Sequence, residues 1–337
     1  MQRKTAHFPC LTYSIGHFPG QGSAMIKRVF ITGGTHGNEA CGVVLAKHFM
    51  ASPELFSGFS FDTTVMLTNV ASIGTNTRYV EEDMNRCFFK ADLDDPTKTA
   101  TLEARRAKEL NAVFGPKGTS AAADFIIDLH NTTAATGVAL MMSPTDELGH
   151  AIAAHLIALD PSVKVCNWNA TQADWPMLPS VGKHGMTFEV GPVPWGVVDG
   201  AVYKQTRRLV LAALDYVEAH NAALARDGPW SSSTVQVHSF VRSVDYPRDA
   251  SGELAGVIHP QLQGRDFGRL ARGDPAFLAL DGQTTIPYTA PEEEVEELFP
   301  FFINEAAYYE KKTAFMLARR IDRPVQVAKQ SPQYELS

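Results

Sequence analysis

The chain has 337 residues, of which 45% are apolar and 20% are charged, enough for one large core or one core and a smaller appended domain. Its formal net charge of -7 argues against a nucleic-acid partner, because such proteins usually carry a basic stripe. No apolar run approaches the ~18 residues that cross a bilayer, so we expect no membrane partner. The four cysteines lie far apart without a C-x-x-C pair, which argues against a disulfide framework and favours the reducing cytoplasm.

Residues 1–25 are predicted to be a poorly ordered N-terminal extension. They contain Arg3 and Lys4 but, up to residue 24, no Asp or Glu, and this composition leaves organellar targeting open. An extension in front of a natural start at Met25 is the alternative interpretation.

Strand patterns alternate with helical patterns over the first two thirds of the chain. A β-branched and aromatic run at 28–32 ends in the Gly-rich segment 33–39, and a helical stretch follows at 40–50. Further strands are predicted at 63–69, 125–129, 138–142, 163–166 and 186–190, and further helices at 101–114, 151–159 and 203–224. This alternation predicts an α/β fold for residues 26–226, with a mostly parallel or mixed sheet flanked by helices.

The pattern changes after residue 226. Residues 227–233, Asp-Gly-Pro-Trp-Ser-Ser-Ser, form a linker rich in helix breakers. Short strand-like segments follow at 235–241, 256–259 and 277–280, separated by Pro and Gly. We therefore predict a smaller β-rich domain over residues 230–327 and a tail at 328–337.

Histidine and glutamate residues follow two of the predicted strands. His36 and Glu39 lie in the turn after the first strand, and His130 follows the strand at 125–129. The carboxyl ends of parallel strands share one edge of the sheet, where open α/β sheets bind ligands. Two histidines and one glutamate form a known ligand set of catalytic zinc. Asp128 could brace a ligand imidazole, whereas a hydrogen-bonded core histidine is the alternative for His130.

Glu189 stands near the end of the apolar strand at 186–190 and precedes a Gly-Pro pair. Burial of an unpaired carboxylate is costly, so Glu189 should face a polar site. A glutamate near metal-activated water is the usual general base in metal-assisted hydrolysis. A buried ion pair is the alternative interpretation.

Arg78, Asn85 and Arg86 lie within one turn-rich stretch. Guanidinium groups bind carboxylates through two parallel hydrogen bonds and can stabilise an oxyanion. Taken alone, the stretch is also typical of a solvated loop.

Taken in order, these motifs resemble the aspartoacylase family, a branch of the zinc carboxypeptidase-like fold that includes the aromatic-preferring third aminoacylase. The resemblance covers roughly residues 27–325. It is carried by Gly-Gly-Thr-His-Gly-Asn-Glu at 33–39, Thr-Arg-Tyr at 77–79, Asp-Met-Asn-Arg at 83–86, Asp-Leu-His-Asn-Thr-Thr at 128–133, Glu-Val-Gly-Pro at 189–192, Val-Asp-Tyr-Pro-Arg at 244–248, His-Pro at 259–260 and Asn-Glu-Ala-Ala-Tyr-Tyr-Glu-Lys-Lys at 304–312.

The resemblance implies a zinc-dependent amidohydrolase whose substrate is a small N-acyl amino acid. One zinc ion per subunit would be held by His36, Glu39 and His130, with Glu189 as the general base and Arg78 polarising the amide carbonyl. The remaining implied roles are binding of the amino acid's carboxylate, by Asn85, Arg86 and Tyr308, and lining of the acyl pocket, by Asn69 and Thr132. Because Tyr308 belongs to the β-rich domain, this domain should cap the active site. The resemblance also implies a homo-oligomer.

The sequence departs from the family ten residues before the predicted base. Aspartate-specific members carry an arginine there that binds the side-chain carboxylate, but this chain has Pro179 and no arginine between Arg106 and Arg207. Lys312 could still serve a side-chain carboxylate. We therefore predict a preference for N-acetylated neutral or aromatic amino acids, with N-acetyl-L-aspartate as the alternative substrate. A metallocarboxypeptidase and a non-catalytic binding protein on the same fold are further alternatives.

Overall fold

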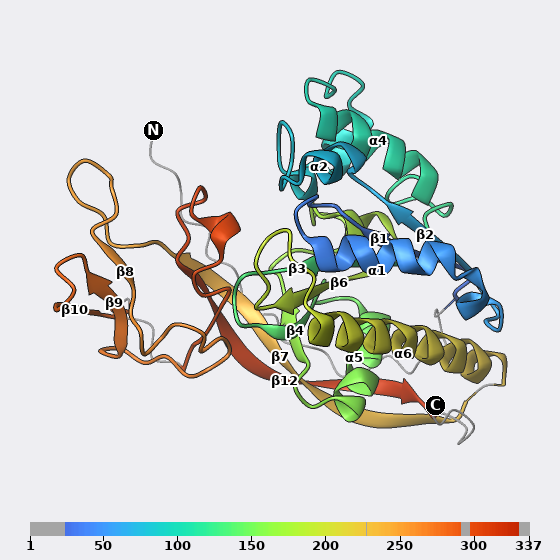
Figure 1. The fold of residues 1–337 in the computed structure, drawn as a ribbon. Coiled ribbons are helices and arrows are strands. Elements are labelled where there is room, and N and C mark those ends of the chain that lie inside the picture. Colours follow the sequence, from blue (N-terminus) through green and yellow to red (C-terminus); the bar gives the residue numbers. More distant parts are fainter. Residues whose placement is uncertain (1–23, 227, 291–296, 330–337) are drawn as a thin grey trace.

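The computed structural model describes residues 24–226, 228–290 and 297–329, so the predicted extension and tail lie almost wholly outside the described residues. Figure 1 shows an α/β part with a smaller part, which contains β8, β9 and β10, at its left. The strands are β1 (Arg28–Gly33), β2 (Asp62–Leu67), β3 (Phe125–Asn131), β4 (Gly137–Met142), β5 (Lys164–Asn167), β6 (His184–Gly191), β7 (Trp230–Val244), β8 (Gly256–Ile258), β9 (Pro275–Ala279), β10 (Thr285–Pro287), β11 (Phe299–Phe301) and β12 (Phe315–Ala328). The helices are α1 (Ala40–Ala51), α2 (Val70–Thr75), α3 (Lys90–Asp94), α4 (Leu102–Phe114), α5 (Glu147–Leu159) and α6 (Gly200–Ala225), with the short 3₁₀ helices η1 (Pro53–Phe56), η2 (Met84–Arg86), η3 (Leu178–Val181) and η4 (Ala306–Tyr308).

Nine strands form one sheet in the order β11-β12-β7-β5-β4-β6-β3-β1-β2. The pairs β2-β1, β1-β3 and β3-β6 are parallel, and β5 is parallel to both β4 and β7. The pairs β4-β6, β7-β12 and β11-β12 are antiparallel. The predicted α/β fold with a mixed sheet is therefore confirmed.

Side chains on the central strands alternate between two differently covered faces of the sheet. On β3, alternate apolar residues from Phe125 to Leu129 pack in a core shared with α1, α5 and α6, so Asp128 and His130 project from the opposite face. Helix α4 covers part of that face, and residues between 299 and 318 cover another part. Helices thus flank both faces, as predicted. The polar residues of β3 lie between the part of their face that α4 covers and the part that the C-terminal residues cover.

The two longest strands, β7 and β12, belong to the main sheet. Strand β7 continues the sheet beyond β5, and β12 pairs with β7 from Val244↔Phe315 to Trp230↔Ala328. The sequence pattern places these residues in a separate β-rich domain, whereas in the structure they extend the sheet of the α/β part. The pairing has a physical reason, because without β7 the strand β5 would be an open sheet edge.

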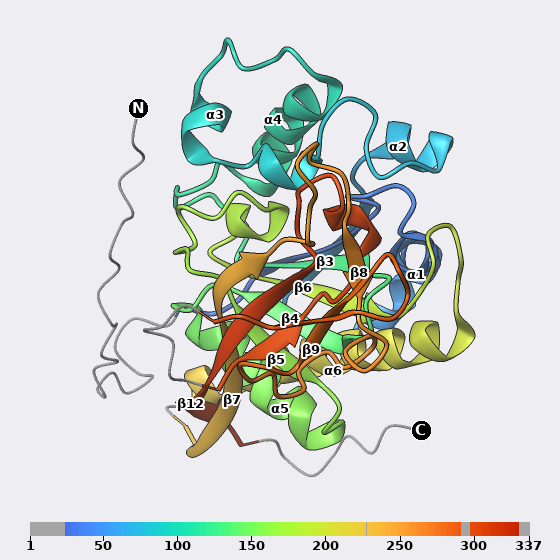
Figure 2. The ribbon, with the colours of Figure 1, turned by 90° about the vertical axis from the view of Figure 1, so that its left-hand side faces the viewer.

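Residues 245–314, between β7 and β12, are called the cap below. The cap contains the three-stranded sheet β10-β9-β8, and its apolar core includes Tyr246 and Phe277. Figure 2, viewed from the side of the cap, shows β8 and β9 in front of the central strands. Within the three described ranges, none of the helices has the length and apolar character of a membrane span.

Candidate active site

The turn between β1 and α1 carries two of the predicted metal ligands. His36 and Glu39 are buried, and Glu39 occupies the N-cap position of α1. The turn packs directly on the start of α2, since a Cβ atom at Gly37 would lie 2.1 Å from the carbonyl carbon of Ser72. Only glycine fits at this point, and the close packing holds the two flanking side chains in place.

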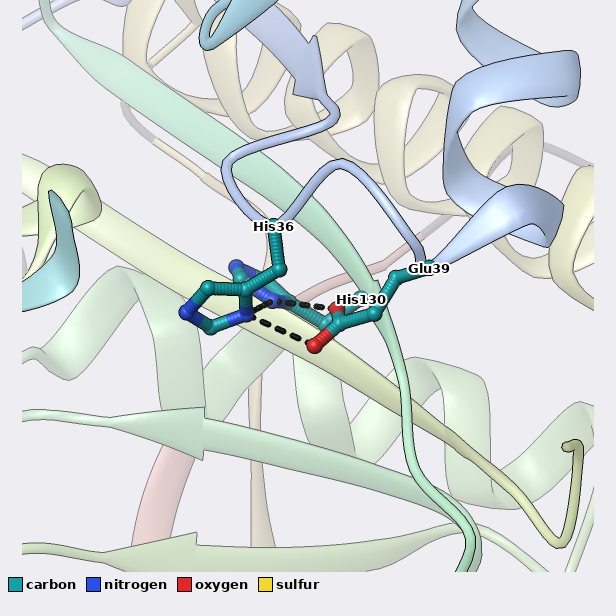
Figure 3. A group of neighbouring side chains, drawn as sticks. All are labelled: His36, Glu39 and His130. Atoms are coloured by element: carbon teal, nitrogen blue, oxygen red, sulfur yellow. Dashed lines mark hydrogen bonds and ion pairs between the residues drawn. The ribbon is translucent and has the colours of Figure 1, made fainter. Parts of the chain in front are cut away.

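His130 projects from β3 towards these two residues. Its Nδ1 lies 2.7 Å from Glu39 Oε2 and 3.1 Å from His36 Nδ1, and His36 Nδ1 lies 2.6 Å from Glu39 Oε1. Figure 3 shows the three side chains converging from the turn and from the strand. One ligand atom of each lies within 4.8 Å of the others. The structure therefore brings the three predicted ligands to one point.

A carboxylate faces the far nitrogen of each imidazole. His130 Nε2 lies 2.7 Å from Asp128 Oδ2, and His36 Nε2 lies 3.0 Å from Asp83 Oδ1. Asp128 is fully buried and is itself held by the Thr32 hydroxyl, which donates to Oδ1 at 2.6 Å. With a proton on each Nε2, both Nδ1 lone pairs face the common point, as carboxylate partners arrange them in metal sites. Two imidazoles and one carboxylate in this arrangement fit a zinc ion.

The ligand residues carry opposite charges that hold the site together. Burial acts to raise the pKa of Glu39, but His36 and His130 hold it well below its ordinary value. Burial acts to lower the pKa of His130, but Asp128 and Glu39 hold it well above its ordinary value. A bound metal ion would replace these contacts between the imidazoles and the Glu39 carboxylate.

Glu189 lies beside the three ligands. Strands β3 and β6 pair in a register that makes Glu189 the partner of His130, and both project from the same face. Burial, with the charges of Glu39 and Glu305, raises the pKa of Glu189 to about 8, although His130 acts against this. A carboxylate with this proton affinity can take a proton from water and pass it on.

Arg78 approaches the same point from the segment after α2. Its NH1 donates to Glu39 Oε1 at 3.1 Å and its NH2 to Asp83 Oδ2 at 3.4 Å. Lys311 of the cap donates to the same oxygen of Asp83 at 2.7 Å. Asp83 therefore joins His36, Arg78 and Lys311. It is not among the residues predicted to form the site, although it begins the Asp-Met-Asn-Arg motif.

Replacing Asp83 with asparagine should weaken zinc binding by about tenfold or more, because His36 would lose its anionic acceptor. The new amide would also present N–H groups to the donors of Lys311. Zinc affinity measured by competition with a chromogenic chelator tests this. Asp92→Asn is the control, since Asp92 is a half-exposed aspartate of α3 that pairs with Lys98 at 3.7 Å. Unchanged zinc affinity in Asp83→Asn would contradict the assigned role.

The residues predicted to bind the substrate carboxylate lie around His130 and Glu189. Asn85 Nδ2 is 3.3 Å from His130 Nε2, and Arg86 NH1 donates to the Asn85 carbonyl at 2.8 Å. Tyr308 of the cap is buried, and burial and the charge of Glu189 raise the pKa of its phenol while Arg86 acts against them. The structure thus places Asn85 beside the ligand His130 and Tyr308 near the predicted base, with Arg86 next to Asn85.

Asn69 and Thr132 use their polar groups inside the protein. Asn69 caps the N-terminus of α2 and donates to Glu103 Oε1 at 3.2 Å. The Thr132 hydroxyl donates to the carboxylate of Glu305, a buried cap residue that also accepts from the Thr133 backbone N–H at 2.7 Å. The acyl-pocket roles of Asn69 and Thr132 stay predictions, and Glu305 fastens the cap to the end of β3.

Lys312 and Pro179 are not in contact with the metal ligands. Lys312 lies near Asp245. Burial acts to raise the pKa of Asp245, and the charge of Lys312 helps to lower it. Pro179 belongs to η3 and packs on the start of β6, since a Cβ atom at Gly185 would lie 2.2 Å from the Pro179 carbonyl oxygen. Glu189 stands near the other end of the same strand. The role of Lys312 stays a prediction, and Lys311 is the lysine that reaches the site.

Comparison with known families gives two adjacent matches. The model described as "Succinylglutamate desuccinylase/Aspartoacylase catalytic domain" matches residues 25–217, and the model described as "AstE/AspA barrel-sandwich hybrid domain" matches residues 233–320. The first match covers most of the α/β part. The second covers the whole cap and portions of the flanking strands β7 and β12.

Curated relatives and a solved structure agree with these matches. A protein of Acaryochloris marina described as "Probable aspartoacylase" is 39% identical over 297 residues, which cover 88% of this chain and 97% of that protein. The "N-acyl-aromatic-L-amino acid amidohydrolase (carboxylate-forming)" of Homo sapiens is 38% identical over 295 residues, which cover 86% of this chain and 90% of that protein. The crystal structure of murine aminoacylase 3 matches with a TM-score of 0.84 and 34% sequence identity, covering 91% of this chain and 100% of that one.

The catalytic-domain match covers more than half of the chain, and the relatives align over nearly their whole length. These relatives are hydrolases of amide bonds, which leaves no support for a non-catalytic binding protein. The chain therefore belongs to the succinylglutamate desuccinylase/aspartoacylase family and is an amide hydrolase.

Proposed function

We propose that the protein uses zinc to hydrolyse the amide bond of N-acyl L-amino acids, chiefly N-acetyl ones with neutral or aromatic side chains, and releases a carboxylate and a free amino acid. The observation that carries the proposal is the meeting of His36, Glu39 and His130 next to Glu189, the register partner of His130. The name of the human relative, which specifies N-acyl-aromatic L-amino acids, supports the same choice of substrate.

One zinc ion per subunit would be held by the Nδ1 atoms of His36 and His130 and by the Glu39 carboxylate. The donor set supports zinc, because three ligands of this kind leave a coordination position open for chemistry. When bound, the ion supplies Lewis-acid activation to water and to the amide carbonyl.

The side chains around the metal ligands transfer the proton, polarise the carbonyl and bind the substrate's carboxylate. Glu189 takes a proton from the attacking water and delivers it to the leaving nitrogen, and the burial that raises its pKa helps it to hold the proton between the two transfers. Arg78 polarises the carbonyl and balances the oxyanion charge with its guanidinium, whose Nε is buried without a partner. Asn85, Arg86 and Tyr308 bind the carboxylate of the amino acid.

The charges near the site favour a substrate with a single carboxylate. Arg86 is assigned to that carboxylate and Arg78 to the oxyanion, while the ammonium of Lys311 is already paired with Asp83 at 2.7 Å. Residues 107–206 contain no arginine. A second carboxylate on the substrate would therefore lose its hydration without gaining a cation of its own.

We expect kcat/KM for N-acetyl-L-tyrosine or N-acetyl-L-methionine to exceed that for N-acetyl-L-aspartate by about tenfold or more. Initial rates on these substrates and on N-acetyl-L-phenylalanine, with and without a chelator, test the function and the preference together. The chelator should abolish every rate. Turnover of none of the four would contradict the function, whereas a preference for N-acetyl-L-aspartate would contradict only the proposed side-chain choice.

Hydrolysis of N-acetyl-L-aspartate is the second candidate, and the description of the Acaryochloris marina relative favours it. In that case the side-chain carboxylate needs a cation, and Lys312 is the residue predicted for it. Lys312→Met should then reduce the rate on N-acetyl-L-aspartate more than the rate on N-acetyl-L-tyrosine.

We further propose that the enzyme is a homo-oligomer in the cytoplasm. The family resemblance supports the oligomer. The compartment is supported by Cys41, Cys87 and Cys166, which are free and buried thiols and suit reducing conditions.

A further inference from the structure

Lys117, just after α4, is a buried lysine that the proposed chemistry does not use. Only 3% of the residue is exposed. Its ammonium donates to the Phe88 carbonyl at 2.9 Å, the Trp175 carbonyl at 2.6 Å and the Ser180 hydroxyl at 2.7 Å. All three N–H groups of the ammonium are thus used, and they join two segments far apart in sequence.

The two segments are residues 85–88, which include predicted carboxylate-binding residues, and the loop 175–180. Apart from Lys117, two hydrogen bonds connect them. The Phe88 N–H donates to the Pro176 carbonyl at 3.1 Å, and the Leu178 N–H donates to Asn85 Oδ1 at 3.0 Å. The loop therefore contacts Asn85 directly, and Lys117 fastens the loop to the same segment.

The contact with Leu178 decides which way the Asn85 amide faces. Because the amide oxygen accepts from Leu178, the amide nitrogen turns to the site and lies 3.3 Å from His130 Nε2. That Nε2 gives its proton to Asp128 at 2.7 Å, so it cannot also accept one from Asn85. The N–H groups of Asn85 are left for a ligand, which suits a residue that binds a carboxylate.

We propose that Lys117 is a positioning residue for the carboxylate end of the substrate, acting through the loop 175–180 and Asn85. The inference rests on the proposed function, since it concerns the part of that site that binds the amino acid's carboxylate. Lys117 touches neither the metal ligands nor Glu189. Loss of its ammonium releases the loop, lets the Asn85 amide rotate, and weakens substrate binding more than the hydrolytic step.

Protonation of Lys117 supplies a readout specific to this role. Burial, opposed by the charge of Asp174 and assisted by that of Lys90, lowers the pKa of Lys117 to about 8. Above that pH the neutral amine has two N–H groups for three acceptors, so one contact is lost. KM should therefore rise as the pH passes through about 8.

The test is the pH dependence of KM and kcat for the zinc-loaded full chain, on whichever of the four N-acetyl amino acids it hydrolyses best. Lys117→Met should raise KM about tenfold near neutral pH with kcat within about threefold, and should remove the further rise near pH 8. Lys117→Arg keeps its charge at every pH used, so its KM should lie nearer the wild-type value and stay flat. A wild-type KM in Lys117→Met, or the same pH-dependent rise in that variant, would overturn the proposal.

Two more variants keep the test decisive if Lys117→Met does not fold. Ser180→Ala removes one acceptor of the ammonium and should raise KM about two- to threefold without changing kcat. Lys183→Met is the control, because Lys183 lies close to the loop in sequence but pairs with Asp124 at 2.7 Å, and its KM should not change. Equal effects of Ser180→Ala and Lys183→Met would overturn the proposal. Failure of the proposed function is distinguished from failure of this proposal by the wild type, which would then hydrolyse none of the four substrates.

Discussion

Glu189→Gln should lower kcat by at least about 100-fold while the protein keeps its zinc. Glutamine preserves the shape of the side chain but cannot take a proton from water. Glu189 is not one of the three residues whose ligand atoms meet, so the metal content should not depend on its charge. Initial rates and zinc content of the same preparations test the two halves of this expectation.

Glu109→Gln is the matched control for that variant. Glu109 is an exposed residue of α4 that pairs with Arg106 at 2.8 Å, so the same chemical change there should leave kcat unaltered. Near-normal turnover by Glu189→Gln would mean that another group activates the water.

His130→Ala should lose both the metal and the activity. His130 is 1% exposed and contributes one of three ligand atoms, and a site left with two ligands holds zinc far more weakly. Zinc content should fall from about one ion per chain to a small fraction of that, and turnover should fall to background.

The folding of His130→Ala is checked by its thermal unfolding in the presence of chelator, compared with metal-free wild type. His48→Ala serves as control, because His48 lies on α1 and packs near Tyr203, outside the site. Full zinc occupancy in His130→Ala would refute the ligand assignment.

Much of the α/β part could be predicted because its signals are local. The strands at 28–32 and 125–129 are short apolar runs that end in glycine or polar residues, and they correspond to β1 and β3 within two residues. His36 and His130 follow such runs, so their meeting at one edge of the sheet also follows from local patterns.

Strand β12 could not be predicted in the same way. It contains four charged residues and Pro324, and a proline inside a run argues against a strand. Strand β11 pairs only with Met316, Leu317 and Ala318, so among the described residues β12 is an edge strand at Pro324, where proline is tolerated. Long pairing with β7, not local composition, makes these residues a strand.

The contacts between the cap and the site depend on distant pairs of residues. Asp83 meets Lys311 across 228 positions of sequence, and Thr132 meets Glu305 across 173. Asp83, Glu305 and Lys311 all belong to motifs recognisable in the sequence, but no spacing rule pairs residues so far apart. Pro179 lies next to Leu178, whose N–H donates to Asn85 Oδ1 at 3.0 Å, and its place as the counterpart of the family's arginine stays a prediction.

The cap leaves and rejoins the main sheet at one point. Val244 and Phe315 are register partners on β7 and β12, so the two junctions lie roughly 5 Å apart. A segment with adjacent ends can be exchanged as a cassette at that pair, and a chimera would bring a relative's counterparts of Tyr308 and Lys311 to the metal centre of this chain. Recombination of this kind would change the cap's contribution to substrate binding, while His36, Glu39, His130 and Glu189 stay on the α/β part.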